Sequence, residues 1–296
     1  MTCKVVLPDN AITLAGSGQS IGALATNCPA GKFAWANGNP AVVTLTPRPA
    51  PDDNIADIDP VSAGVAVVTV SFSGASASVT VTVIARHFVI VFGDKGKGIH
   101  NLGRLPELAA RTHEREIRAK KAPGVPAFGP ADIITVTHVS TVADLIAALN
   151  VNNVIYLAYF GHSWNEAGSV GALFIGENHA ADSNLTTGQD PPGELQTCTS
   201  PNTLPAGAFR PDASVRLFSC RGSFGTDSAA EQIAKHLKRQ VFGFDNSGGS
   251  IFTNDPKLGH GLRSATAADL KAAVLAGKDV WMVPSDGTPH FKSFGP

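Results

Sequence analysis

The chain has 296 residues, of which 43% are hydrophobic, so it has room for two domains with ordinary cores. Its 23 Lys and Arg residues are balanced by 24 Asp and Glu residues, which gives a net charge of −1. A charge so close to zero excludes a strong general attraction to nucleic acid or to an anionic membrane, and no RNA- or DNA-binding motif is present. No apolar run approaches about 18 residues, so no membrane-spanning helix is predicted.

The four cysteines are too few for a scaffold held together by disulfides. Cys3 and Cys28 lie near the start of the chain and can pair in an oxidising compartment. No CxxC motif occurs, and no group of His and Cys residues has the spacing of zinc ligands. The sequence therefore predicts neither a metal site nor a cofactor.

Residues 1–85 are predicted to form a first, all-β domain. This part is poor in charge and rich in small and β-branched residues. Val65–Phe72 and Ser78–Val83 alternate apolar with small polar residues on either side of a turn that contains Gly74, as strands with one buried face do. Shorter strands are expected at Ala11–Leu14 and Ala41–Leu45. Because no helical pattern interrupts them, a small antiparallel sandwich is expected.

The segment Trp35-Ala-Asn-Gly-Asn-Pro40, followed by Gly64–Val70 and Val79–Val83, resembles a bacterial Ig-like domain. That resemblance implies an Ig-like β-sandwich with Trp35 in its core. Such domains act as spacers or as modules that contact another protein, often in bacterial surface and exported proteins.

Residues 86–296 have a different pattern, which predicts an α/β domain. His87–Gly93 is a continuous apolar run that ends in Gly, as is typical of a strand buried on both faces. Strands are then expected at 132–138, 154–160, 214–219 and 241–244, and helices at 106–121, 141–149 and 226–239. The alternation of strands and helices favours a mainly parallel sheet flanked by helices, with ligands bound beyond the carboxyl ends of its strands.

Two of these strands lead into reactive side chains. His162 follows the strand at 154–160, and Cys220 follows the strand at 214–219. If the two strands are neighbours, both side chains reach the same edge of the sheet. A thiol with an ordinary pKa of about 8.5 needs a base to become a nucleophile at neutral pH, and a nearby imidazole can supply it.

The same residues carry a resemblance to a family. Gly161-His162 after an apolar strand, and Ser219-Cys220-Arg221-Gly222 after another, resemble the caspase-like clan of cysteine peptidases, which includes gingipains, legumain, clostripain and separase. The His precedes the Cys at a spacing near the roughly 50 residues described for caspases. The resemblance implies a cysteine endopeptidase with Cys220 as nucleophile and His162 as general base and acid, acting on a protein or peptide substrate.

Two departures from the family pattern concern the oxyanion hole and specificity. Ser163 stands where the family usually has Gly, so the backbone amide of Ser163 is the candidate oxyanion donor. Phe218 replaces the Gln that contributes to Asp recognition in caspases, and specificity for Asp is therefore not predicted. Family members that cut after Arg or Lys use an acidic residue, and Asp94 and Asp245 each follow a strand at the correct edge. Either is a candidate for binding a basic P1 residue.

Two other functions compete with the thiol peptidase. Gly161–Asn165 is one Gly short of the Gly-x-Ser-x-Gly elbow of α/β-hydrolases, which makes Ser163 the nucleophile of an esterase, with Asp245 or Asp286 and His290 as partners. Alternatively, the chain is a catalytically inactive binding or adhesion module, to which the Ser in place of Gly is the only hint.

An Ig-like domain joined to a peptidase suggests a bacterial enzyme that is secreted or injected. The N-terminal residues lack the basic and apolar regions of a usual signal peptide. Cytoplasmic residence therefore stays open as an alternative to export by another route.

Overall fold

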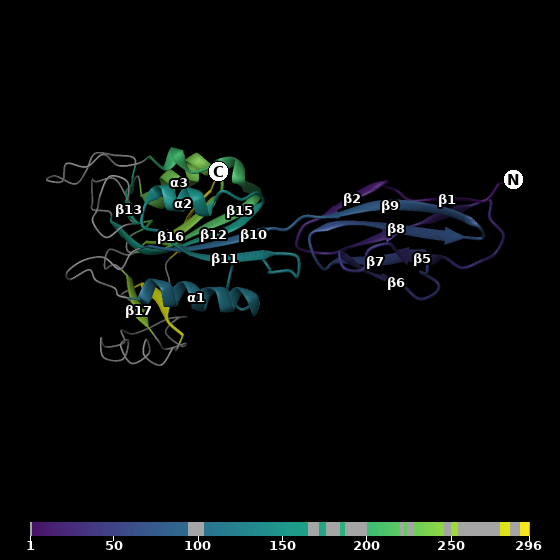
Figure 1. The fold of residues 1–296 in the computed structure, drawn as a ribbon, viewed down its shortest axis with the longest axis horizontal. Helices are drawn as coiled ribbons and strands as arrows, with labels where there is room; N and C mark the ends of the chain where they lie inside the picture. The colour runs from purple at the N-terminus through teal and green to yellow at the C-terminus, as the bar shows by residue number, and fades with distance from the viewer. Residues whose placement is uncertain are drawn as a thin grey trace. The chain divides into compact units, whose positions relative to one another are not determined.

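The computed structural model describes residues 2–93, 104–164, 172–175, 184–186, 200–219, 222–223, 228–245, 250–253, 279–284 and 291–295. The chain divides into two compact units, drawn in Figure 1. The first comprises Met1–Arg86 and Ala127–Ile133, and the second comprises His87–Pro126 and Ile134–Pro296. Among the described residues, no helix is long and apolar enough to cross a membrane.

The described part of the first unit contains nine strands in three sheets. A four-stranded sheet has the order β2-β9-β8-β5, a three-stranded sheet has the order β3-β7-β6, and β1 pairs with β4. The strands are β1 (Lys4–Val6), β2 (Ala11–Leu14), β3 (Gln19–Gly22), β4 (Leu24–Thr26), β5 (Ala34–Asn37), β6 (Val43–Pro47), β7 (Ile55–Pro60), β8 (Gly64–Phe72) and β9 (Ala75–Val83).

The hairpin of β8 and β9 supplies much of the core of this unit. Val68, Val79 and Val81 are fully buried, while the residues between them point outwards, so the predicted alternation is confirmed. Ser73 and Gly74 form the turn with positive φ values of 49° and 86°, the backbone conformation that a tight two-residue hairpin turn requires.

Two further links hold the first unit together. Cys3 and Cys28 form a disulfide. Arg86 Nε donates to Asp132 Oδ1 at 2.9 Å, and the Asp132 side chain is completely buried. This ion pair attaches Ala127–Ile133 to the strands of residues 1–86.

The second unit contains a larger sheet with the strand order β11-β10-β12-β15-β16-β19, which β13 and β14 extend from β12. The strands are β10 (His87–Phe92), β11 (Ile133–His138), β12 (Val154–Trp164), β13 (Ala172–Phe174), β14 (Asn184–Thr186), β15 (Phe209–Ser219), β16 (Gln240–Phe244), β17 (Ser250–Thr253), β18 (Trp281–Pro284) and β19 (Phe291–Phe294). The helices are α1 (Leu105–Arg118), α2 (Val142–Ala148), α3 (Ala229–Leu237) and the 3₁₀ turns η3 (Pro201–Thr203) and η4 (Ala206–Ala208).

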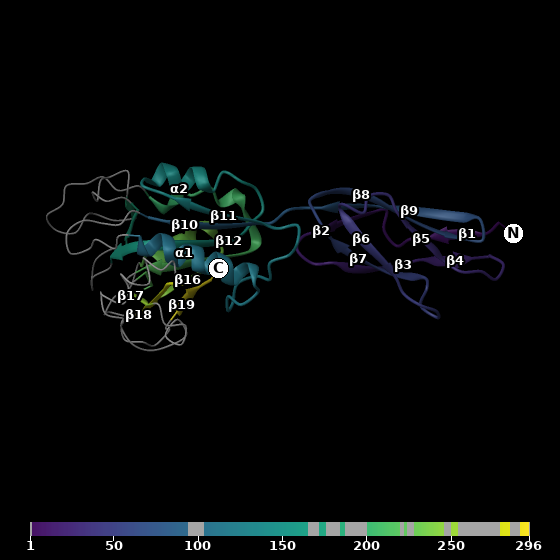
Figure 2. The same cartoon turned by 60° about the horizontal axis from the view of Figure 1, so that its bottom comes forward.

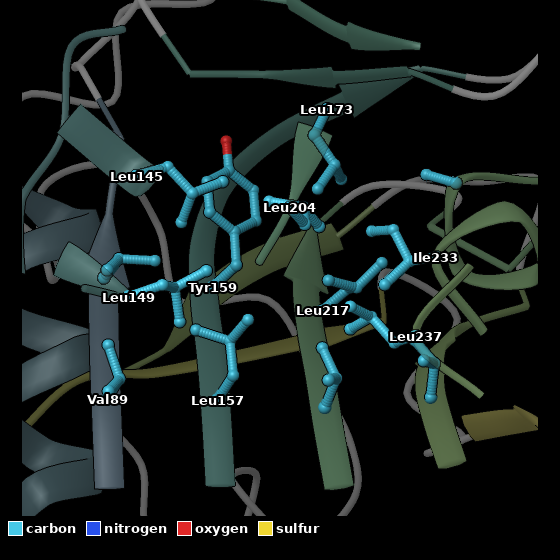
Figure 3. Packing of buried hydrophobic residues seen from close by; sticks show 14 of the residues in the cluster. Val89, Leu145, Leu149, Leu157, Tyr159, Leu173, Leu204, Leu217, Ile233 and Leu237 are labelled. Atoms are coloured by element: carbon cyan, nitrogen blue, oxygen red, sulfur yellow. The ribbon is translucent and has the colours of Figure 1, made fainter. Parts of the chain in front are cut away.

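Helices pack on both faces of this sheet. The helices α2 and α3 cover one face, where Leu145, Leu149, Ile233 and Leu237 meet strand residues such as Leu157 (Figure 3). The helix α1 lies against the opposite face, as Figures 1 and 2 show. Strands β10, β12, β15 and β16 run parallel, and β19 is antiparallel to β16.

Side chains cap the starts of two helices. Thr141 caps α2 in a capping box with Asp144. Ser228 caps α3 by accepting a hydrogen bond from the backbone of Glu231, two residues after the predicted start of this helix.

The predicted fold class is nevertheless wrong. The sequence predicts an Ig-like sandwich followed by a helix-flanked, mainly parallel α/β domain. The structure is instead mostly β, and its strands are distributed over several sheets. In the first unit, β2 pairs with β9 in parallel, which a purely antiparallel sandwich excludes. In the described part of the second unit, ten strands outnumber three α-helices, and antiparallel pairs extend the sheet or form a separate one.

The physical reason for the error is the number of very short strands. The sequence predicts no element over β14, β17, β18 or β19. Strands of three or four residues carry too little periodicity to be recognised, because their stability comes from pairing with a partner strand. The sequence pattern therefore predicts the long elements and misses most of the strands of three or four residues.

Candidate functional site

The candidate site lies at the carboxyl ends of β12 and β15. The two strands are parallel neighbours, and their register ends with the Cα pairs Phe160–Phe218 and Gly161–Ser219. Gly161 immediately precedes His162, and Ser219 immediately precedes Cys220. Cys220 itself lies outside the described residues. The pairing therefore brings together the two strand positions from which His162 and Cys220 follow.

Contacts between side chains agree with this register of the two strands. The rings of Phe160 and Phe218 stack with centroids 4.4 Å apart and an interplanar angle of 3°. Because strand side chains alternate between faces, the next position on this face is His162 in β12. Phe218, which replaces the Gln of caspases, is a buried core residue here and also contacts Phe244 and Phe291.

Tyr159 holds the backbone of His162 from the other face of the sheet. Its hydroxyl donates to the carbonyl oxygen of His162 at 3.1 Å. A Cβ atom on Gly161 would lie 2.4 Å from this hydroxyl, and one on Gly93 would lie 3.2 Å from it and 2.9 Å from the carbonyl oxygen of Ile175. Gly93, just after β10, and Gly161, within β12, thus leave room for the Tyr159 hydroxyl to reach the His162 carbonyl.

His162 and Ser163 lie inside β12, beyond the predicted end of the strand. The strand continues to Trp164 because it forms an antiparallel pair with β13, in which His162 faces Phe174 and Ser163 faces Leu173. His162 is partly exposed, although its Nε2 atom is buried.

Ser163 is only 6% exposed. A nucleophile elbow needs an exposed Ser on a sharp turn between a strand and a helix. A buried Ser within a strand does not have that geometry. The other residues of the esterase hypothesis, Asp286 and His290, lie outside the described residues.

The chain is also anchored just after the candidate nucleophile. The Ser223 amide donates to the carbonyl oxygen of Phe244 at 3.0 Å, and the Ala230 amide donates to that of Gly222 at 3.0 Å. A Cβ atom on Gly243 would lie 2.4 Å from Ser223 Oγ, so glycine in β16 permits this close packing. Strand β16 and helix α3 therefore fix the position of the chain two residues beyond Cys220.

Of the two acidic candidates, Asp94 and Asp245, only Asp245 is among the described residues. Asp245 directly follows β16, the neighbour of β15, and its side chain is exposed at the same edge of the sheet. Asp94 lies outside the described residues. Within the described part of the chain, no group of His, Cys, Asp or Glu residues could hold a metal ion.

Two residues near this site, Tyr159 and His113, are not among the candidates that the sequence predicts. Tyr159 looks like any other apolar member of its strand, since the hydroxyl contact with His162 depends on the two glycines around it. His113 lies four residues after Ala109 and four before Ile117, and both of these are buried. That spacing places His113 on the buried face of the predicted helix and is the signal that could have identified it.

No family model matches the chain, and no curated protein matches it. Six chains of known structure match, among them the crystal structure of the S-layer protein SbsC domains 4 and 5. That match has 13% sequence identity and a TM-score of 0.25, and it covers 28% of this chain. It covers 51% of the SbsC chain, so this protein matches about half of that structure. A likeness at this level assigns neither a family nor a function.

Proposed function

We propose that the chain is a cysteine peptidase in which Cys220 is the nucleophile and His162 the general base and acid. The observation that carries the proposal is the parallel register of β12 and β15, which ends on the residues immediately before the two members of the pair. The resemblance of the Gly-His and Ser-Cys-Arg-Gly segments to caspase-like peptidases supports the same pair.

In the proposed reaction, His162 accepts the proton of the Cys220 thiol, and the thiolate attacks the scissile carbonyl carbon. The resulting oxyanion collapses and expels the amine, which takes the proton back from His162. A thioester between Cys220 and the acyl half of the substrate remains. Water, deprotonated by His162, hydrolyses this thioester and restores the thiol.

The remaining roles in the proposal concern binding of the oxyanion and the substrate. The backbone amide of Ser163 is the candidate oxyanion donor, a role that does not use the Ser side chain. Asp245, exposed at the end of β16, and Asp94 are the candidates for pairing with a basic P1 side chain. These roles predict a preference for Arg or Lys over Asn or Asp at P1.

The test compares Cys220→Ala and Ser163→Ala with the unmodified protein on fluorogenic peptides that carry Arg, Lys, Asn or Asp at P1, and on an ester. We expect Cys220→Ala to abolish peptide hydrolysis and Ser163→Ala to retain it, because the Ala backbone keeps the amide. Cys198→Ala, which removes another thiol, is the matched control and should remain active.

Each alternative has its own outcome. Peptide hydrolysis that survives in Cys220→Ala contradicts the proposal. Ester hydrolysis that is lost only in Ser163→Ala indicates the serine esterase. A folded protein that hydrolyses none of the substrates indicates a binding module.

A further inference from the structure

A buried polar group lies beneath the Phe160–Phe218 pair, on the face of the sheet that α1 covers. His113 of α1 is 7% exposed, and its Nε2 atom is 2.8 Å from the hydroxyl oxygen of Tyr156, which is fully buried in β12. The Nδ1 atom of His113 lies 3.9 Å from a carboxylate oxygen of Glu116.

The imidazole of His113 contacts both strands of the candidate site. Its centroid is 5.0 Å from the ring of Phe218, 5.6 Å from that of Phe160 and 5.7 Å from that of Tyr156. Phe160 and Phe218 are each two residues before a member of the proposed catalytic pair. A single side chain of α1 thus touches β12 and β15 one strand repeat below His162 and Cys220.

Neighbouring residues of α1 bind the segment that leads into β18. Glu116 accepts a hydrogen bond from the indole of Trp281 at 2.9 Å, and Thr112 Oγ1 accepts one from the Val280 amide at 3.0 Å. Arg115 forms an ion pair with Asp279. Three successive residues, Asp279, Val280 and Trp281, are therefore bound to the helix that carries His113.

The charge state of this group follows from its burial. Burial lowers the pKa of His113, and the charge of Arg216 on β15 lowers it further, while Glu116 acts in the opposite direction. Burial also raises the pKa of Tyr156 far above its ordinary value. The Tyr156 hydroxyl therefore keeps its proton at neutral pH and forms its hydrogen bond with a neutral imidazole.

An apolar side chain could fill the same space without the cost of desolvating an imidazole and a phenol. The hydrogen bond between His113 and Tyr156 is directional, so it fixes the position of α1 along β12 in a way that apolar contact does not. We propose that His113 is a positioning residue, which binds Tyr156 and packs on Phe160 and Phe218 and thereby sets the relative position of the strand ends that carry His162 and Cys220. This inference rests on the proposed function.

The test uses Tyr156→Phe, which removes the hydroxyl and keeps the ring, and His113→Gln as a second variant in case the first does not fold. Thr112→Val is the matched control, since it removes a buried hydrogen bond from the same helix without touching the Phe pair. We expect kcat to fall about tenfold in Tyr156→Phe with KM nearly unchanged, because small displacements of reacting groups slow the chemical step. The rate at which iodoacetamide alkylates Cys220, followed by mass spectrometry, should fall in the same variant.

Equal kcat values and equal alkylation rates in Tyr156→Phe, His113→Gln and Thr112→Val would overturn the inference, since the effect would then be one of general packing. The alkylation rate separates this result from failure of the proposed function. If Cys220→Ala keeps full peptidase activity, the proposed function fails, while the alkylation of Cys220 still decides whether His113 positions the strand ends.

Discussion

The two faces of the larger sheet are packed in different ways. The face under α2 and α3 is almost entirely aliphatic, with Leu157, Val215 and Leu217 among its strand residues. The face under α1 is aromatic and contains buried polar groups, including His113 and Thr112. Burying polar groups costs free energy unless they are hydrogen-bonded, so the aliphatic face forms its core with a smaller desolvation penalty. One face therefore consists mainly of apolar packing, while the other also contains hydrogen-bonded polar groups near the ends of β12 and β15.

The largest expected effect comes from truncating the aromatic face. Phe218→Ala removes a ring that contacts His113, Phe160, Phe244 and Phe291, and it should lower the free energy of unfolding by about 3–5 kcal/mol. Urea denaturation measures this change, and a loss below about 1 kcal/mol would contradict the described packing. The folded variant should also lose the proposed peptidase activity, because the ring is next to both strand ends.

The matching change on the aliphatic face is Leu217→Ala, one residue away on the same strand. It should cost about 3 kcal/mol, since Leu217 is buried among residues of α3. In contrast to Phe218→Ala, the variant should keep the kcat of the unmodified protein under conditions in which it is fully folded. Equal losses of kcat in both variants would remove the distinction between the two faces.

The third prediction concerns pH. The pKa of His113 is lowered in the folded state. Once the pH falls below about 6.5, His113 therefore becomes protonated in the unfolded chain while it stays neutral in the folded chain. The contribution of His113 to stability is therefore complete above that pH and is lost as the pH decreases, at no more than about 1.4 kcal/mol per pH unit.

His113→Gln removes this titration. The difference in unfolding free energy between the unmodified protein and the variant should shrink between pH 7 and pH 5. His236→Gln, on the α2 and α3 face, is the control. A difference for His113→Gln that does not change with pH would show that a buried neutral imidazole is not the distinguishing feature of the α1 face.

The smallest expected effect concerns the Tyr159 hydroxyl, a polar group on the aliphatic face that donates to the backbone of His162. Tyr159→Phe removes the hydrogen bond to the His162 carbonyl, which should cost about 1 kcal/mol in stability. It should also slow peptide hydrolysis, because the backbone of His162 loses a contact that holds it. Unchanged hydrolysis would show that the two glycines and the strand pairing hold His162 by themselves.

The sequence pattern predicts where most of the long elements lie, although it does not predict the fold class. The positions of β8, β9, β10, β12, β15 and α2 follow from periodicity and caps, because long elements repeat the same signal several times. The two apolar runs before His162 and Cys220 also predict β12 and β15, which are parallel neighbours in the sheet.

Other features depend on contacts between distant residues. The sequence contains no signal for the parallel pairing of β2 with β9, or for the attachment of Ala127–Ile133 to the first unit through Arg86 and Asp132. His113 and Tyr156 are 43 residues apart, and their hydrogen bond arises only when α1 lies on the sheet. Phe218 was interpreted by its place in a family motif, whereas its environment is a cluster of aromatic rings.

The disulfide between Cys3 and Cys28 has a mechanical consequence. A tensile force applied at the N-terminus would pass from Cys3 through the sulfur bridge directly to Cys28, so the residues between them would carry almost none of the load. Strands β1 to β4 lie within that bypassed segment. Reduction of the bridge would transfer the load to the three-residue pairing of β1 with β4, which would then be the first part of the unit to unzip.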